Sequence, residues 1–341
     1  MRVFYLSYIF LQLSIEILGQ ITDTFTCVPN AQCPGGGGGG GDINPRVGPD
    51  LRIVSPTGAT TTAAPTSTCP PGYVACTTLP KCGTPSVQPS TANGQATRGS
   101  LPWQAYLTNS AGTYIGGGML LDSYHVLTAA HKTNESGIIV YMGVYNPQTD
   151  LSGNTMRSNV QSVSRYPSYN ISTLRDDIAI LRLSTPLTMS ATAIAGCLPA
   201  AGRSFVGNDC IVAGWGQTNF NTYDAPTSIL KQAIVRIIDA QTCLNSYSNA
   251  NLLGTNAALY LDTQREICAG GSINIDACTK DGGSPLMCND GTKYVAAGLV
   301  IWGKNCGMQN VYGVYVSVPS YRSWIDCVVR AFNSNQVPVC Y

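Results

Sequence analysis

Short apolar stretches, rich in β-branched and aromatic residues, recur between turn-forming residues from about residue 93 onward. They predict strands at 104–107, 137–141, 177–181, 211–212, 233–237, 294–301 and 311–318. A long amphipathic pattern appears only near the end, at 321–331. The pattern therefore predicts an all-β fold, an antiparallel β-sandwich or β-barrel, closed by a C-terminal helix.

The N-terminal region has a different composition. An apolar run at 3–18 follows Arg2, which predicts a signal peptide over residues 1–19 with cleavage near Gly19. A membrane anchor is the weaker alternative, because the run is short and contains Glu16. Residues 20–92 are rich in Gly, Pro, Thr and Ser, and 35–41 is an unbroken glycine run that cannot hold one conformation cheaply.

Composition narrows the function classes. The 341 residues carry a net charge of +1 with 11% charged residues, which gives no electrostatic reason to expect nucleic acid or an anionic membrane as partner. The 14 cysteines indicate an oxidising, extracellular compartment. Sequons at Asn134 and Asn170 are candidate glycosylation sites. With two histidines in the chain, no metal site has convincing ligand spacing, and no cofactor is expected.

Three motifs carry the candidate chemistry. His131 ends the sequence TAAH, Asp177 begins DIAIL, and Gly282 lies in CTKDGGSPLMC at 278–288. The first two follow the chain order of a chymotrypsin-type triad. Together with GWG at 214–216 and WG at 302–303, residues 93–330 resemble the chymotrypsin/trypsin-like serine proteases. That resemblance implies two six-stranded antiparallel β-barrels with a cleft between them.

The same resemblance implies that catalysis has been lost, so that no residue is expected to be catalytic and His131 and Asp177 are vestigial. Gly282 stands where the family has its nucleophilic serine, and losing that serine typically removes about 10⁶ in rate. Lys280 stands where an oxyanion-hole glycine is usual, so a side chain borders the hole and the backbone is expected to resist the glycine geometry.

The activation sequence is also missing. The segment at 90–94 reads STANG and offers no Arg or Lys to cut, so Asp281 lacks the amino group that it pairs with in the family. A displaced nucleophile at Ser284 or Thr279 is the enzymatic alternative. Each would lie several ångströms from the required place, since an extended residue spans about 3.3 Å.

A specificity pocket is implied by resemblance as well. Asp276 matches the residue at the base of a pocket for Lys or Arg, and Gly303 and Gly313 match the small residues that keep it open. The functional interpretation is a pocket that binds a basic side chain of a partner without cutting it. From sequence alone we favour the alternative, an inherited and solvated carboxylate without a present role.

The cysteines fit the resemblance. It implies the core bridges Cys210–Cys288, Cys243–Cys268 and Cys278–Cys306, while the two positions of a further family bridge hold Gly116 and Lys132. Cys82 and Cys197 resemble the bridge that ties an N-terminal module to a protease domain. Residues 27–76 resemble a clip domain that lacks one of its three bridges, which implies Cys27–Cys69 and Cys33–Cys76. The sequence leaves the pairing of Cys327 and Cys340 open.

The predicted organisation is a signal peptide (1–19), a disulfide-stapled clip-like module (20–82), a linker (83–92), an inactive trypsin-like domain (93–330) and a C-terminal tail (331–341). Arg46-Val47 and Arg52-Ile53 are candidate cleavage sites in the clip-like module.

The resemblance implies a secreted, non-catalytic clip-domain serine protease homologue. Such proteins are cofactors or regulators of extracellular protease cascades, for example in innate immunity through prophenoloxidase activation and melanisation. The expected partner is a cascade protease or zymogen. The alternatives are a weakly active endopeptidase with a displaced nucleophile and an extracellular adhesive or matrix protein. The oligomeric state is left open.

Overall fold

The computed structural model describes residues 26–29, 73–76, 81–154, 156–217, 227–249 and 251–340. The chain divides into two compact units, Met1–Leu79 and Pro80–Tyr341. In the first unit, strands β1 (Thr26–Pro29) and β2 (Tyr73–Cys76) pair antiparallel and place Cys27 opposite Ala75. The bridges predicted for Cys27, Cys33, Cys69 and Cys76 involve positions outside the described residues.

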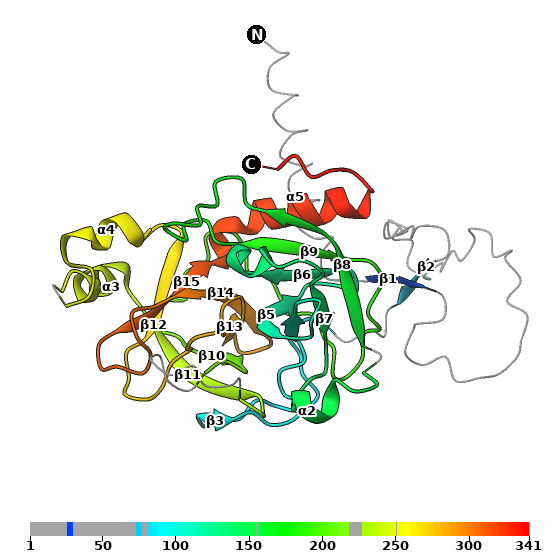
Figure 1. The fold of residues 1–341 in the computed structure, drawn as a ribbon, viewed down its shortest axis with the longest axis horizontal. Helices are drawn as coiled ribbons and strands as arrows, with labels where there is room; N and C mark the ends of the chain where they lie inside the picture. The colour runs from blue at the N-terminus through cyan, green and yellow to red at the C-terminus, as the bar shows by residue number, and fades with distance from the viewer. Residues whose placement is uncertain are drawn as a thin grey trace, which may run out of the picture. The chain divides into compact units, whose positions relative to one another are not determined.

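The second unit begins with a closed six-stranded barrel (Figure 1). Its strands run around the barrel in the order β4-β5-β6-β9-β8-β7. They are β4 (Gln104–Thr108), β5 (Tyr114–Leu120), β6 (His125–Thr128), β7 (Ile139–Tyr141), β8 (Arg157–Arg165) and β9 (Ala179–Leu183). All neighbouring pairs are antiparallel, which leaves this barrel without a free edge.

A second six-stranded barrel follows in the chain. Its strand order is β10-β13-β14-β15-β12-β11, and pairing of β10 with β11 closes it. The strands are β10 (Asp209–Gly214), β11 (Lys231–Ile238), β12 (Glu266–Gly270), β13 (Pro285–Asn289), β14 (Tyr294–Trp302) and β15 (Tyr312–Ser317). The two-residue strand β3 (Gly94–Gln95) adds to the outer side of β11. The fold expected from the sequence, two antiparallel six-stranded barrels, is therefore confirmed.

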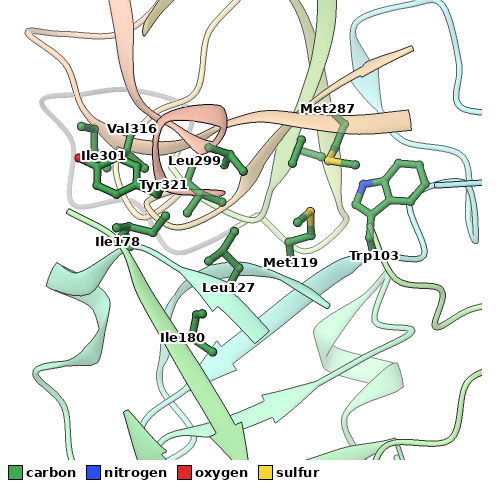
Figure 2. Close-up of a cluster of buried hydrophobic side chains, with 14 of the residues drawn as sticks. Trp103, Met119, Leu127, Ile178, Ile180, Met287, Leu299, Ile301, Val316 and Tyr321 are labelled. Carbon is green, nitrogen blue, oxygen red and sulfur yellow. The ribbon is translucent and has the colours of Figure 1, made fainter. Parts of the chain in front are cut away.

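Apolar side chains of both barrels meet in one buried cluster. Figure 2 shows Met119, Leu127 and Ile180 of the first barrel facing Met287 and Leu299 of the second. All five are fully or almost fully buried. Burying such side chains contributes about 1.5–3 kcal/mol each, so the cluster fixes how the two barrels pack and where the cleft between them lies.

The helices are short except for the last one. They are α2 (Pro147–Asp150), α3 (Ala240–Tyr247), α4 (Ala257–Tyr260) and α5 (Arg322–Asn333), with 3₁₀ turns η2 (Ala130–Thr133), η3 (Gly254–Asn256) and η4 (Val318–Tyr321). Helix α5 lies near β9, along the first barrel (Figure 1). It buries Trp324, Ile325, Val328 and Phe332. The helix runs two residues beyond the predicted end at 331.

Disulfide bonds tie the loops of the second unit together. Cys210–Cys288, Cys243–Cys268 and Cys278–Cys306 form as the resemblance implied. Cys327 pairs with Cys340, which resolves the pairing that the sequence left open and fastens the C-terminal tail to α5.

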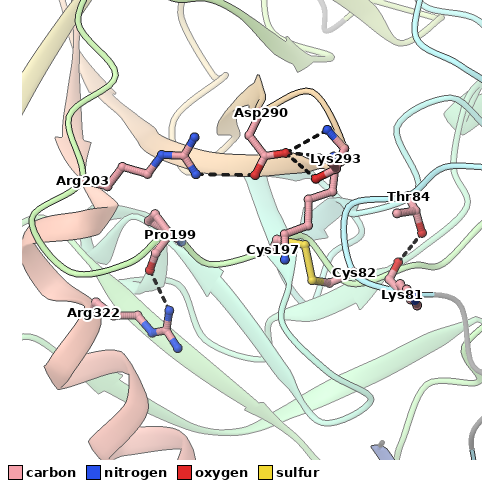
Figure 3. The surroundings of a disulfide bond; sticks show 10 residues. Lys81, Cys82, Thr84, Cys197, Pro199, Arg203, Asp290, Lys293 and Arg322 are labelled. Atoms are coloured by element: carbon pink, nitrogen blue, oxygen red, sulfur yellow. Dashed lines mark hydrogen bonds and ion pairs between the residues drawn. A yellow bond between two sulfur atoms is a disulfide. The ribbon is translucent and has the colours of Figure 1, made fainter. Parts of the chain in front are cut away.

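The Cys82–Cys197 disulfide fixes the start of the second unit to the segment between the barrels (Figure 3). On one side of it, Thr84 donates a hydrogen bond to the Lys81 carbonyl. On the other, Arg322 donates to the Pro199 carbonyl at 2.6 Å.

Within the described residues, no helix is long and apolar enough to cross a bilayer.

Candidate functional site

His131 and Asp177 lie together in the cleft. His131 sits in η2 directly after β6, and Asp177 lies just before β9, the strand that pairs with β6. The Asp177 carboxylate accepts from His131 Nδ1 at 2.5 Å and from the His131 backbone N–H at 2.8 Å. The Asp177 side chain is fully buried, while 20% of the His131 side chain is exposed. This pair is a hydrogen-bonded imidazole–carboxylate couple with one ring nitrogen, Nε2, turned to the cleft.

The group opposite His131 Nε2 is a glycine. A Cβ built on Gly282 would lie 2.6 Å from His131 Nε2 and would also come too close to Lys132 Cε. A Cβ on Gly116 would lie 2.9 Å from Lys132 Cδ. The Lys132 side chain therefore passes between Gly116 and Gly282 and occupies the space that a nucleophile's side chain would need. Without a hydroxyl or thiol on residue 282, His131 has no nucleophile there to deprotonate.

Ser284 and Thr279, the candidates for a displaced nucleophile, do not face His131. Ser284 is fully buried, and its hydroxyl accepts a hydrogen bond from Gln104 Nε2 at 3.1 Å. The hydroxyl also fills the space beside Gly117, where a Cβ would collide with it. Thr279 is exposed in a turn, and its carbonyl accepts from the Gln217 N–H. This geometry favours structural roles for both side chains.

Lys280 adopts the backbone conformation expected of glycine. Its φ is +74°, and the Asp281 N–H donates to the Cys278 carbonyl at 3.0 Å, which is typical of a type II turn with Lys280 at its third position. The expectation that a lysine would resist this geometry is wrong. The turn is held at both ends by Cys278–Cys306 and by Asp281, so the strain of a left-handed lysine is tolerated.

We expect Lys280→Gly to stabilise the protein by about 1 kcal/mol, because glycine adopts positive φ without the steric cost of a Cβ. The measurement is the midpoint of urea unfolding. Lys304→Gly is the matched control: Lys304 is not among the residues with positive φ, so the same change there is expected to be neutral or destabilising. Equal effects at both positions would count against strain at Lys280.

Asp281 is held by backbone amides. Its carboxylate accepts from the Gly216 N–H at 2.8 Å and from the Cys278 N–H at 2.9 Å. Burial raises the pKa of Asp281 to about 6, an effect that these amides and the Lys132 charge oppose. The segment at 90–95 packs against β11, where Gln232 Nε2 donates to the Ser90 carbonyl at 2.7 Å. Asp281 is thus satisfied without a new amino terminus.

Asp276 lines a cavity of about 190 Å³, and His131, Lys132 and Gly282 line the same cavity. Gly303 and Gly313 line it, and a Cβ on Gly303 would lie 3.9 Å from Gly313 Cα. Among the described residues, these two glycines thus face each other and leave room for a ligand. The three residues expected to form a specificity pocket, Asp276, Gly303 and Gly313, therefore line one cavity.

The carboxylate of Asp276 differs from the solvated group that we favoured from sequence. Its Oδ2 accepts from the Gly307 N–H at 3.2 Å, while Oδ1 is buried and has no hydrogen-bond partner among the described residues. Burial raises the pKa of Asp276 to about 7, and the amides of Gly307 and Ala277 oppose the rise. The cause is the close wall of Gly313 and Tyr315, which excludes water from Oδ1.

This pKa predicts that stability falls as pH rises. The folded state holds a proton on Asp276 up to about pH 7, whereas an unfolded aspartate loses it near pH 3.8. Between these values the folded state binds more protons, so the free energy of unfolding decreases with pH, by about 2–4 kcal/mol in total. Asp276→Asn should make that slope shallower, and Asp281, whose pKa is also raised, should keep part of it. The measurement is urea unfolding from pH 4 to 8, and an unchanged slope in the variant would contradict the assignment.

Asn134 and Asn170 are both exposed, and Asn170 Oδ1 accepts from the Ser172 N–H at 2.9 Å. Their glycosylation stays a prediction. Within the described residues, no group of three or more His, Cys, Asp or Glu side chains is placed to hold a metal ion.

Sequence reasoning missed the role of Lys132. It noted only that Gly116 and Lys132 replace two cysteines that are bridged in the resembling family. The location of the Lys132 side chain could have been predicted from that observation. Two positions joined by a disulfide face each other, so a lysine at one of them extends into the space left by a glycine at the other. Trp302 and Tyr315, which line the cavity beside Asp276, were not singled out as site residues either.

Comparisons with known proteins agree with this geometry. The family model described as Trypsin matches residues 92–325. A curated protein of Aedes aegypti, "Inactive CLIP domain-containing serine protease A3", is 37% identical over 346 residues, which cover 94% of this chain and 70% of that protein. The similarity therefore extends through the N-terminal region as well as through both barrels.

Proposed function

Because the chain belongs to the trypsin family as a clip-domain serine protease homologue, we propose that it acts without proteolysis, as a secreted protein-binding regulator of an extracellular protease cascade. One observation carries this proposal. The space opposite His131 Nε2 holds Gly282 and the Lys132 side chain, while the neighbouring cavity with Asp276 stays open. The group needed for chemistry is absent, and the room needed for binding a ligand is kept.

The partner in this proposal is a cascade protease or its zymogen, and the setting is innate immunity of the melanisation type, through prophenoloxidase activation. The support is the resemblance to clip-domain homologues and the printed name of the relative, which calls that protein inactive. Secretion fits the predicted signal peptide and the five disulfides among the described residues.

The alternative of a displaced nucleophile receives no support from the cleft, since Ser284 is buried and bonded to Gln104. The alternative of an adhesive or matrix protein depends on the glycine and threonine tracts at 35–68. These tracts lie outside the described residues, and the open cavity favours a binding role for the protease-like domain.

The test is depletion and add-back in body fluid of the source animal. Removing the protein with an antibody should lower prophenoloxidase activation several-fold, and the recombinant wild-type protein should restore it. Reduced and alkylated protein, which lacks the disulfides, is the matched control and should not restore it. Immobilised protein should enrich a trypsin-like protease or zymogen. Unchanged activation after depletion, with no protease or zymogen enriched, would contradict the proposal.

A further inference from the structure

We propose that the cleft binds an acidic segment of a partner polypeptide, with the ammonium groups of Lys132 and Lys280 as the counter-charges of an aspartate or glutamate side chain. The inference deepens the proposed binding function by giving the chemistry of the partner segment, and it rests on that function.

Lys132 brings a positive charge to the place where a nucleophile is missing. A Cβ on Gly116 would lie 3.0 Å from Lys132 Cε, and a Cβ on Gly282 would come closer still to that atom. The end of the Lys132 side chain therefore lies in the cleft beside the His131 imidazole, where residue 282 has no side chain of its own. Lys132 is half-buried, so its ammonium group remains within reach of a ligand from solvent.

The Lys132 ammonium has no ion-pair partner within the described part of the chain. Burial lowers the pKa of Lys132; Asp281 and Asp177 oppose that fall, and the charge of Lys280 adds to it. The two carboxylates are already engaged, because Asp281 accepts from two backbone amides and Asp177 accepts twice from His131. Lys132 is thus a partly desolvated cation that a bound anion would stabilise.

Lys280 presents a second cation to the same cavity. It lines the cavity with Lys132, is half-buried, and has no ion-pair partner among the described residues. The backbone N–H groups of Lys280 and Gly282 donate no hydrogen bond to a described residue, although those of Asp281 and Gly283 do. Like charges that line one cavity repel each other, so a carboxylate bound between them removes this repulsion and accepts from the free donors.

The carboxylic acids of the cleft lining do not neutralise these lysines. Asp276 is the one carboxylic acid among the residues that line this cavity and the neighbouring cavity of about 400 Å³. Its pKa of about 7 leaves it about half protonated at neutral pH. The neighbouring cavity adds Lys304, which is exposed and forms no ion pair with the residues that the structure describes. The lining is therefore cationic at neutral pH and complementary to an acidic partner.

The sizes of the two cavities favour a polypeptide as the ligand. The first cavity, of about 190 Å³, is smaller than the roughly 300–1,000 Å³ usual for small-molecule sites, and it suits a single side chain. The second cavity shares Trp302 with the first and is lined by Leu174, Leu253 and Tyr260, among others. An extended segment can place a carboxylate beside the two lysines and a neighbouring apolar side chain in the second cavity.

The test compares two labelled hexapeptides with C-terminal amides, one alternating Leu with Asp and the other alternating Leu with Asn. Asn has the shape of Asp without its charge. Fluorescence anisotropy with the wild-type full chain in 50 mM NaCl should give a Kd at least 10-fold lower for the Asp peptide, because hydrogen bonds to charged groups are about twice as strong as neutral ones. Equal Kd values for the two peptides would overturn the inference, and this comparison needs no variant to fold.

Three variants locate the binding site. Lys132→Met keeps the length of the side chain without its charge, and Lys280→Gly suits the positive φ of that residue, so both should fold. Each should reduce the advantage of the Asp peptide at least 3-fold and leave binding of the Asn peptide unchanged. Lys293→Met is the matched control, since Lys293 is half-buried too but lines neither cavity, and it should bind as wild type. An advantage that persists in both cleft variants would overturn the assignment to the cleft.

Two further ligands test the chemistry of the partner. A hexapeptide that alternates Leu with Arg should bind the wild-type protein at least 10-fold more weakly than the Asp peptide, and tighter binding of the Arg peptide would overturn the inference. A heparin hexasaccharide supplies sulfate groups instead of carboxylates. If it binds more tightly than the Asp peptide and loses affinity in both cleft variants, a polypeptide ligand is overturned; weaker binding supports it.

Failure of this inference and failure of the proposed function give different results. A protein that restores prophenoloxidase activation but binds the Asp and Asn peptides equally would keep its regulatory function and lose this ligand class. A protein that prefers the Asp peptide but leaves activation unchanged, with no protease or zymogen enriched, would keep the acidic ligand and lose the regulatory function.

Discussion

Gly282→Ser alone is expected to leave the protein without measurable amidase activity and to lower the free energy of unfolding by about 1–3 kcal/mol. The reason is Lys132, whose Cε lies too close to the position of the new Cβ, with His131 Nε2 only 2.6 Å from that position. In a protease with an otherwise intact site, the serine is worth about 10⁶ in rate. If the missing serine were the only defect, restoring it should therefore raise the rate about 10⁶-fold, whereas we expect no increase in rate.

The clash can be isolated with a second substitution. Lys132→Ala in the Gly282→Ser background should recover about 1–2 kcal/mol of the lost stability, since the two side chains no longer share one space. Activity should still be absent, because Lys280 borders the oxyanion site and Asp281 has no amino-terminal partner. The measurements are urea unfolding and hydrolysis of a fluorogenic arginine amide. Hydrolysis by the single Gly282→Ser variant would show that Lys132 does not block the site.

Removing the Cys210–Cys288 disulfide should cause the largest loss of stability among the changes considered. The bond joins β10 to β13 inside the second barrel and spans 78 residues. In the chain-entropy model, a loop of this length contributes about 4–5 kcal/mol. Both sulfur atoms are buried, so replacing both cysteines with alanine also leaves a small cavity.

The matched control is the Cys327–Cys340 pair, which spans only 13 residues. Replacing both of its cysteines with alanine should cost about 3 kcal/mol in the same model. Urea unfolding of the two double variants at one pH provides the comparison. A larger loss for the Cys327–Cys340 variant would contradict the ranking by loop length.

The all-β class could be predicted from the sequence because several buried strands follow a clear pattern, whereas the two six-stranded barrels were expected only from the family resemblance. Segments such as β14 and β15 are rich in Val, Ala and Tyr, and their burial is nearly continuous. Strand β5 gave no such signal because its sequence, YIGGGML, contains three glycines. The structure explains one of them: Gly117 must lack a side chain because the Ser284 hydroxyl lies against it. Contacts between distant segments of this kind leave no local pattern.

The candidate site could be predicted only as far as its motifs reach. His131 and Asp177 were found because their spacing and neighbours are distinctive. The left-handed backbone of Lys280 was not expected, because local propensity opposes it and the constraint comes from the surrounding turn and disulfide. The burial of Asp276 Oδ1 likewise depends on Tyr315, which follows it by 39 positions in the chain and meets it only in the folded barrel.

The absence of a nucleophile in the cleft is tested most directly by a fluorophosphonate probe, which labels activated serines covalently. The protein is treated with the probe before and after limited trypsin cleavage, with active trypsin as the positive control, and read by intact mass. We predict no adduct in either form. An adduct that peptide mapping places on Ser284 or Thr279 would contradict the non-catalytic function.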